Sequence, residues 1–114
     1  MGRDQAKEKT DVMQGTLDLL ILRTLQLEPL HGYGIAQRIE QMTRGTFRVN
    51  GGSLFPALYA LEKEGFLRAE WRASENNRRA KYYALTAAGR RKLGEEKRNW
   101  ARVAQAIARV LGGA

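Results

Sequence analysis

The sequence predicts a small, mainly α-helical domain that carries one antiparallel β-ribbon. Apolar residues recur at helical spacing over most of the chain. Two short runs with strand-like alternation, 66–73 and 80–85, flank a polar loop at 74–79. The chain has 114 residues with a hydrophobic content of 43%, which is enough for one modest core. We therefore expect a single domain in which the ribbon is attached to a helical body.

The composition excludes several kinds of site. The chain has no cysteine, which rules out disulfides, cysteine-ligated zinc and iron–sulfur clusters. One histidine cannot form a multi-histidine site, so we expect no metal and no cofactor. We interpret His31 as a turn residue whose ring hydrogen-bonds locally rather than as a base or ligand. The chain has no run of 18 apolar residues and no secretory signal, so we expect it to be cytoplasmic, without a membrane partner.

The positive charge is concentrated in one part of the chain. The formal net charge is +8 and the sequence pI is about 10.3. Residues 66–92 include eight basic residues and only two acidic ones, Glu70 and Glu75. A net charge of this size can serve solubility alone. We favour an anionic partner, most often nucleic acid, because the excess charge lies on the ribbon and the segment after it.

The first half of the chain contains two predicted helices. Residues 1–10 show no apolar periodicity and are expected to form a flexible N-terminal tail. A first helix is predicted over about 11–27, with apolar residues on two sides. Pro29 and Gly32 interrupt the pattern. A second helix follows over 33–42, with the apolar set Tyr33, Ile35, Ala36, Ile39 and Met42.

A short strand is predicted over 46–49, where polar and apolar residues alternate, and it could add a third strand to the ribbon. A third helix follows this strand. Either Asn50 or Ser53 can cap this helix. Pro56 fits a first turn if Ser53 is the cap and would kink the helix if Asn50 is. Gly65 ends the helix. The predicted buried face holds Leu54, Leu58 and Leu61, and the outer face presents Ser53, Phe55, Pro56, Tyr59 and Lys63.

The ribbon comprises strands over 66–73 and 80–85. Alternation predicts that Leu67, Ala69, Trp71 and Ala73 share a half-buried face. At the tip, Asn76 and Asn77 can adopt left-handed backbone angles. We also expect one of the two tyrosines at positions 82 and 83 to face the core.

A long last helix is predicted from a cap at Thr86 to about Leu111, a length of roughly 39 Å. Its apolar residues recur every seven positions, which fits either an amphipathic helix on its own core or a helix with a partner. We favour dimerisation, because the first helix also has an uncovered apolar flank. The predicted dimer interface is Leu19, Leu22, Leu93, Trp100, Val103, Ala104, Ile107, Val110 and Leu111.

This order of elements is that of a winged helix-turn-helix domain, over 11–86, followed by a C-terminal dimerisation helix, 87–114. Here the sequence resembles a specific family, the PadR-type bacterial transcriptional regulators, over about residues 11–111. The motifs that carry the resemblance are GTLDLLIL at 15–22, HGYGI at 31–35, GSLFPAL at 52–58, LEKEG at 61–65, and Arg78 with KYYALT at 81–86.

The resemblance implies a homodimer that binds a roughly palindromic operator in double-stranded DNA, usually as a repressor. It also implies that the C-terminal helix supplies the dimer contact. The sequence departs from the family in three places. Phe55 stands where a tyrosine hydroxyl usually donates to a phosphate, Asn76 and Asn77 replace a glycine pair, and Arg79 and Ala80 replace a proline and a basic residue.

In such a protein, basic side chains neutralise phosphates and the exposed side of the third helix reads bases. Phe55 and Pro56 can touch only thymine methyls or sugars, so we expect part of the specificity to come from DNA shape. The predicted DNA-binding residues are Ser53, Phe55, Pro56, Tyr59, Lys63, Arg72, Asn76, Asn77, Arg78, Arg79 and Lys81.

The sequence leaves open the role of Trp100 and one alternative function. Trp100 is either a large core residue or, paired with its symmetry mate, half of a sandwich for a small aromatic effector. Enzymatic activity is not expected, because Ser53 has no histidine near it in sequence and no phosphate-binding loop is present. The alternative function is a winged helix used only for protein contacts, which would not need Arg78, Arg79 and Lys81 together.

Overall fold

The computed structural model describes the backbone of residues 2–112 and the side chains of residues 15–112. Within these residues, four helices and three short strands follow one another. They are α1 (Gly2–Leu27), β1 (Leu30–His31), α2 (Gly32–Met42), α3 (Gly51–Lys63), β2 (Leu67–Ala73), β3 (Arg79–Leu85) and α4 (Ala87–Val110). The predicted mainly helical fold with a small antiparallel ribbon is confirmed.

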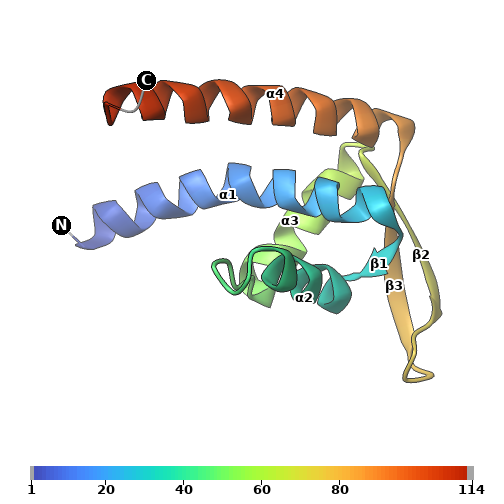
Figure 1. Cartoon of the computed structure of the whole chain (residues 1–114). Helices are drawn as coiled ribbons and strands as arrows, with labels where there is room; N and C mark the ends of the chain where they lie inside the picture. The colour runs from blue at the N-terminus through green and yellow to red at the C-terminus, as the bar shows by residue number, and fades with distance from the viewer. Residues whose placement is uncertain (1, 113–114) are drawn as a thin grey trace.

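Helix α1 is the central element, since it contacts α2, α3, β3 and α4. Figure 1 shows α1 and α4 side by side and antiparallel, with α2 and the tip of the β2–β3 hairpin at the edge opposite α4. None of the described helices is long and apolar enough to cross a membrane.

The core lies where α1, α2 and α3 meet. Ile21 and Leu22 of α1 and Ile35 of α2 are fully buried. Each such side chain stabilises the fold by about 1.5–3 kcal/mol. The predicted buried face of α3 is confirmed, because Leu54, Leu58 and Leu61 are at most 2% exposed. In α2, however, Tyr33 and Met42 are exposed. Tyr33 does not share the face of Ile35 and Ile39, and Met42, which shares it by spacing, is the last residue of the helix.

Side-chain caps fix where three helices begin. His31 Nδ1, Asn50 Oδ1 and Thr86 Oγ1 each accept a hydrogen bond at 3.0 Å from the backbone N–H three residues later. Of the two predicted N-caps of α3, Asn50 and Ser53, the structure therefore shows Asn50. Pro56 therefore lies inside α3, where its ring nitrogen cannot donate to the carbonyl of Gly52. Gly65 ends α3 as predicted, with a left-handed φ of +84°.

The third strand of the sheet does not come from where the sequence predicted it. Residues 46–49 form no strand, and the Thr43 hydroxyl instead accepts from the Phe47 N–H to close a loop. The third strand is β1, which pairs with β3 in a sheet ordered β1-β3-β2. Phe47 and Val49 still pack on the core from the loop. The alternation of polar and apolar residues over 46–49 therefore reflects the partial burial of Phe47 and Val49. A run of four residues is too short to specify which strand it pairs with.

One of the two long helices, α1, begins earlier than predicted. α1 begins at Gly2 rather than near residue 11, so the periodicity placed its start too late. The flexibility expected for residues 1–10 stays a prediction, because their side chains lie outside the part described. α4 ends at Val110, close to the predicted end, and begins after the Thr86 cap as expected.

Candidate nucleic-acid interface

The outer face of α3 is the first component of the site. The side chains predicted to point outward are all exposed: Ser53, Phe55, Pro56, Tyr59 and Lys63. Phe55 and Tyr59 are 54% and 65% exposed, although the opposite face of the same helix is anchored in the core. This face offers one base, Lys63, and few hydrogen-bond donors for reading base edges.

Phe55 is positioned by a glycine at the start of α2. A Cβ on Gly32 would lie 2.7 Å from Phe55 Cε1, so only glycine allows the ring to pack there. Tyr33, the next residue, is 73% exposed and lines the same hollows as Phe55. The sequence reasoning missed Tyr33 as a surface residue. The signal that could have identified it is an aromatic residue between two glycines at a helix start.

The hairpin of β2 and β3 forms the wing. The two strands pair antiparallel from Leu67 with Leu85 to Ala73 with Arg79. At the tip, the Ser74 N–H donates to the Arg78 carbonyl at 2.7 Å, and Asn77 has a φ of 60°. The left-handed angle predicted for the tip is thus confirmed at Asn77 and not at Asn76. Tyr83 is the tyrosine that faces the core, at 6% exposure.

The wing leaves the body of the protein partway along β2. Leu67 is buried and Ala69 partly buried, as predicted, but Trp71 and Ala73 are exposed. The alternation continues along the strand, yet the core does not extend that far. Trp71 therefore lies on the inner face of a projecting hairpin, with the Arg79 guanidinium 5.8 Å from its ring centroid.

A hollow of about 410 Å³ separates the wing from the helices. Its helical wall comprises His31, Gly32, Tyr33 and Phe55, and its wing wall includes Trp71, Arg78, Arg79 and Lys81. A second hollow, of about 740 Å³, lies between α2 and the start of α3. Tyr33 and Phe55 line both hollows. One wall of the space beside α3 is therefore aromatic and the other strongly basic.

Two of the predicted DNA-binding residues, Lys81 and Arg72, contact other side chains of the same chain. Lys81 Nζ lies 3.0 Å from Glu62 Oε1 of α3, and this hydrogen bond raises the pKa of Lys81. The Arg72 guanidinium lies 4.0 Å from the centroid of the Tyr82 ring, outside the lining of the hollow. Among the described side chains, no carboxylate pairs with Arg78 or Arg79. Both arginines are exposed and line the hollow, so they are available to an anion that enters it.

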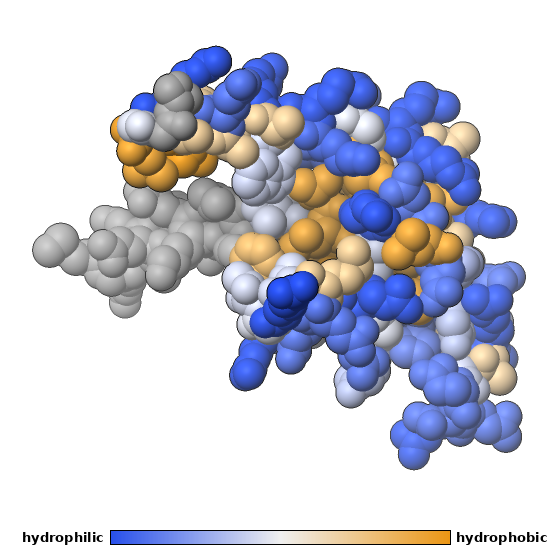
Figure 2. All heavy atoms as spheres, in the orientation of Figure 1, coloured by the Kyte–Doolittle hydropathy of each residue, from blue (hydrophilic) through white to orange (hydrophobic). Residues whose placement is uncertain are grey.

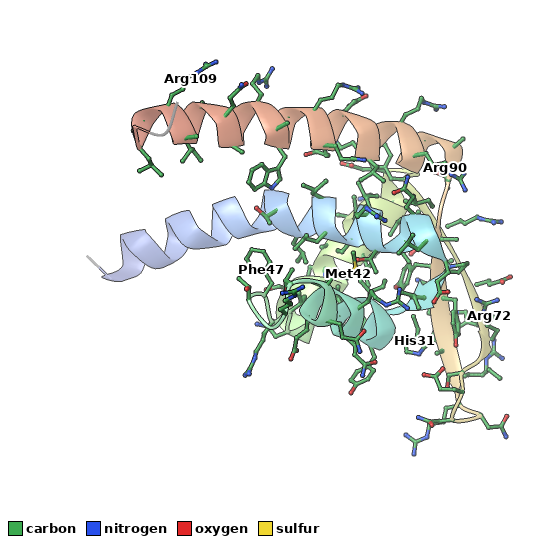
Figure 3. The ribbon with its side chains drawn as sticks, in the orientation of Figure 1. His31, Met42, Phe47, Arg72, Arg90 and Arg109 are labelled. Carbon is green, nitrogen blue, oxygen red and sulfur yellow. The ribbon has the colours of Figure 1, made fainter. Side chains whose placement is uncertain are left out.

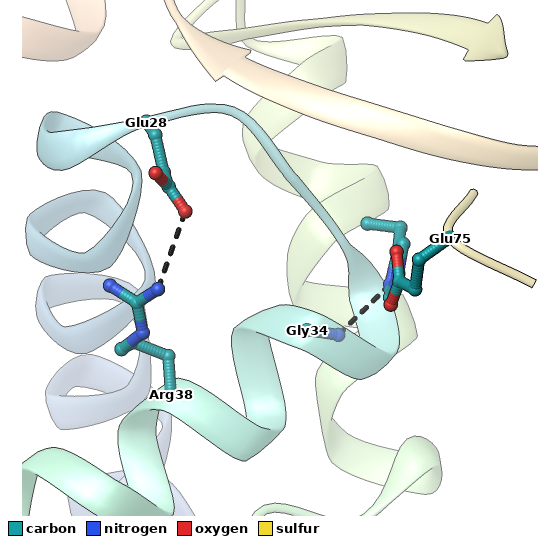
Figure 4. A network of polar contacts seen from close by, with 5 residues as sticks. Glu28, Gly34, Arg38 and Glu75 are labelled. Atoms are coloured by element: carbon teal, nitrogen blue, oxygen red, sulfur yellow. Dashed lines mark hydrogen bonds and ion pairs between the residues drawn. The ribbon is translucent and has the colours of Figure 1, made fainter. Parts of the chain in front are cut away.

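His31 connects the wing tip to the start of α2. Its Nδ1 accepts from the Gly34 N–H at 3.0 Å (Figure 4). Its Nε2 lies 3.5 Å from Glu75 Oε1. The pKa of Glu75 lies below its usual value, first because of its own backbone N–H and second because of His31. The local hydrogen bond predicted for His31 is confirmed.

The predicted dimer residues divide into three groups. Leu22 and Leu93, at 0% and 2% exposure, pack in the chain's own core, so they offer no surface to a second chain. Leu19 and Ala104 are partly buried. The others are 45–85% exposed on α4 and at its C-cap: Trp100, Val103, Ile107, Val110 and Leu111. Figure 2 shows apolar residues gathered beneath the far end of α4.

Comparison with known proteins agrees with this geometry. Residues 21–95 match the transcriptional regulator PadR-like family. The chain is 33% identical over 103 residues to the transcriptional regulator Rv3488 of Mycobacterium tuberculosis, covering 90% of each protein.

Solved structures give the same result. A transcriptional regulator from Clostridium thermocellum superposes with a TM-score of 0.79 at 26% identity, covering 87% of this chain and 96% of that one. A PadR family transcription regulator from Clostridium difficile R20291 gives a TM-score of 0.71 at 27% identity, covering 83% and 97%. The chain therefore belongs to the PadR-like family of transcriptional regulators.

Proposed function

We propose that this regulator is a homodimeric repressor that binds double-stranded DNA at a pseudo-palindromic operator. The observation that carries the proposal is the hollow between α3 and a wing whose Arg78 and Arg79 lack carboxylate partners among the described residues. A sugar–phosphate strand that entered this space would meet guanidinium groups on one side and Tyr33 and Phe55 on the other. Neutralised phosphates supply most of the affinity of such a complex.

The exposed side of α3 is proposed to enter the major groove. Ser53 and Tyr59 provide hydroxyl groups for base edges, while Phe55 and Pro56 contact thymine methyls or sugars. Because this face has few donors, sequence preference also depends on how easily the operator adopts the bound shape.

The apolar residues of α4 are proposed to pair with the same residues of a second copy. A helix of 24 residues is about 36 Å long, which is close to the roughly 34 Å between successive half-sites. Two copies of α3 could thus face the same side of a duplex. Trp100 would lie beside its symmetry mate, where two rings can hold a planar aromatic effector.

The test of DNA binding is a gel shift on a fragment that contains the promoter of the protein's own gene. The wild-type protein should retard this fragment, and Arg78→Ala with Arg79→Ala should weaken binding at least tenfold. The slope of log affinity against log salt should fall by about two. Arg38→Ala is the matched control, since Arg38 pairs with Glu28 at 3.3 Å away from the wing (Figure 4). Equal loss in the control, or no loss in the wing variant, contradicts the assignment.

The test of the effector uses tryptophan emission. In a Trp71→Phe background, Trp100 is the one remaining tryptophan. Planar cationic and phenolic compounds that enter between two Trp100 rings should quench its emission in a saturable way. A broad panel without saturable quenching would reject an effector site at this position.

A further inference from the structure

The proposed DNA-binding surface of α3 and the wing leaves one strongly charged surface of the protein unexplained. Four arginines follow one another along the exposed side of α4: Arg91, Arg98, Arg102 and Arg109. Their spacings of seven, four and seven residues keep them on one face at about 3.6 residues per turn. We call these four residues the α4 arginine stripe; it extends for about 27 Å.

The stripe faces away from the apolar side of α4. By helical geometry it lies roughly opposite Trp100, Val103 and Ile107. Figure 3 shows Arg109 directed away from α1, and Figure 2 shows hydrophilic residues along the edge formed by α4. A dimer that buries the apolar side of α4 would therefore leave the stripe in solvent.

The charge of the stripe is not neutralised by its surroundings in the described part of the chain. Among those side chains, no ion pair reaches any of its arginines. Glu96 pairs instead with Lys92 at 3.1 Å, and Arg102 donates to the amide oxygen of Asn99. Glu95 is the one carboxylate of α4 near the stripe, and Arg90 and Lys97 add two further exposed bases.

The stripe lies far from the proposed DNA-binding surface of α3 and the wing. In Figure 1, α4 forms one edge of the molecule, and α2 and the wing tip form the opposite edge. The extent of the protein is 51 × 33 × 27 Å, so the two edges lie on different sides of its body. A duplex held by α3 and the wing would thus remain on the far side from the stripe.

We propose that the α4 arginine stripe binds the phosphate backbone of a second DNA duplex, so that one dimer bridges two duplexes. An acidic protein surface is the less suitable partner, because the hot spots of protein interfaces combine arginines with buried aromatic residues. The residues between the arginines, Gly94, Ala101 and Gln105, provide none. Guanidinium groups among small residues suit a charged, anchor-free polyanion. The proposal rests on the proposed function in that the wing holds the first duplex and two copies pair through α4.

The experiment is a two-duplex capture assay with the full chain. A promoter fragment is fixed to beads, protein is added, and retention of a labelled random-sequence duplex is measured at low and moderate salt. The wild-type protein should retain the second duplex. Replacing all four stripe arginines with glutamine should reduce retention at least fivefold while operator affinity changes less than twofold.

Replacing the same arginines with lysine is the matched control, since it keeps the charge, and both glutamine and lysine favour helix. This variant should retain most of the second duplex. Sedimentation and helix content should be unchanged in both variants. Equal retention by the glutamine variant, or no retention by the wild-type protein, would overturn the proposal.

A second arm separates this result from failure of the proposed function. In the Arg78→Ala/Arg79→Ala protein, residual binding to a free duplex is measured by fluorescence anisotropy, with and without the stripe. Loss of this residual binding on neutralising the stripe supports the proposal even if the wing assignment is wrong. If the stripe instead binds polyglutamate and leaves duplex binding unchanged, its partner is an acidic protein and the proposal is rejected.

Discussion

Lys81 of the wing and Glu62 of α3 are joined by a 3.0 Å hydrogen bond between Nζ and Oε1. This pair fastens the wing to the helix that it flanks. The Glu62 carboxylate also neutralises the positive charge of Lys81, which the sequence predicted to contact DNA. The pair is about one-third exposed, so its contribution to stability is expected to be below about 1 kcal/mol.

Replacing Glu62 should therefore strengthen DNA binding rather than weaken it. In Glu62→Gln the Lys81 ammonium is free to meet a phosphate, so affinity should rise and the salt slope steepen by about one. Lys81→Met should change affinity less than Arg78→Met, since Lys81 is already paired. Salt-dependent gel shifts of the three variants measure this. Weaker binding by Glu62→Gln would contradict this prediction. It would show that the Lys81–Glu62 pair matters more for positioning the wing than for neutralising the charge of Lys81.

Phe55→Tyr should restore a phosphate donor. The ring packs against Gly32 and is 54% exposed, so a hydroxyl at its end can reach solvent or DNA. One new hydrogen bond of about 1 kcal/mol corresponds to about a fivefold gain in affinity. Tyr59→Phe serves as the reciprocal control. An unchanged dissociation constant in Phe55→Tyr would place this ring away from the backbone of the duplex.

Gly89→Ala should destabilise the fold. A Cβ at this position would overlap the Phe66 carbonyl, which is backbone and cannot move aside cheaply. We expect a loss of about 2 kcal/mol or more in the free energy of unfolding by urea. Gly94→Ala on the same helix is the control, since its nearest neighbour is the flexible end of Arg98 at 3.4 Å. This second substitution should be neutral or stabilising by up to about 1 kcal/mol.

Asp18 should make stability depend on pH. Burial first, and then the carboxylates of Glu96 and Glu64, raise its pKa from 3.8 to about 6. The folded state therefore holds this proton more tightly than the unfolded state. Stability is fully present below about pH 4, falls as the pH rises to about 6, and stays reduced above that.

Asp18→Asn removes this penalty. The full shift corresponds to about 3 kcal/mol. Because the side chain is only about half-buried, solvent screening should reduce the gain to about 1 kcal/mol. Urea unfolding should show the variant to be more stable at pH 7.5 and equal to the wild type near pH 4. A variant that is less stable at both pH values would mean that the carboxylate makes a favourable contact.

Ile107→Glu should convert the proposed dimer to a monomer. Ile107 is 52% exposed on the apolar side of α4, and burying an unpaired carboxylate in an interface is unfavourable. Sedimentation velocity at micromolar concentration measures the outcome. Gln105→Glu is the control, because it adds the same charge on another side of the helix. A dimer that persists in Ile107→Glu would place the interface elsewhere.

Much of the fold was predictable because its signals are local. The spacing of Leu54, Leu58 and Leu61 identified the buried face of α3. The caps at Asn50 and Thr86 and the glycine at position 65 are chemical requirements of helix ends. The strand over 46–49 failed because the same alternation describes a loop whose apolar residues touch the core.

By itself, the sequence determined the order of the four helices and the hairpin, the buried face of α3 and the concentration of positive charge on the wing. It also carried the family motifs. Only the tertiary structure decided which residues are available for function. It placed Leu22 and Leu93 in the chain's own core, paired Lys81 with Glu62 and stacked Arg72 on Tyr82. Periodicity reports a residue's position on its own helix or strand, whereas availability depends on partners distant in sequence.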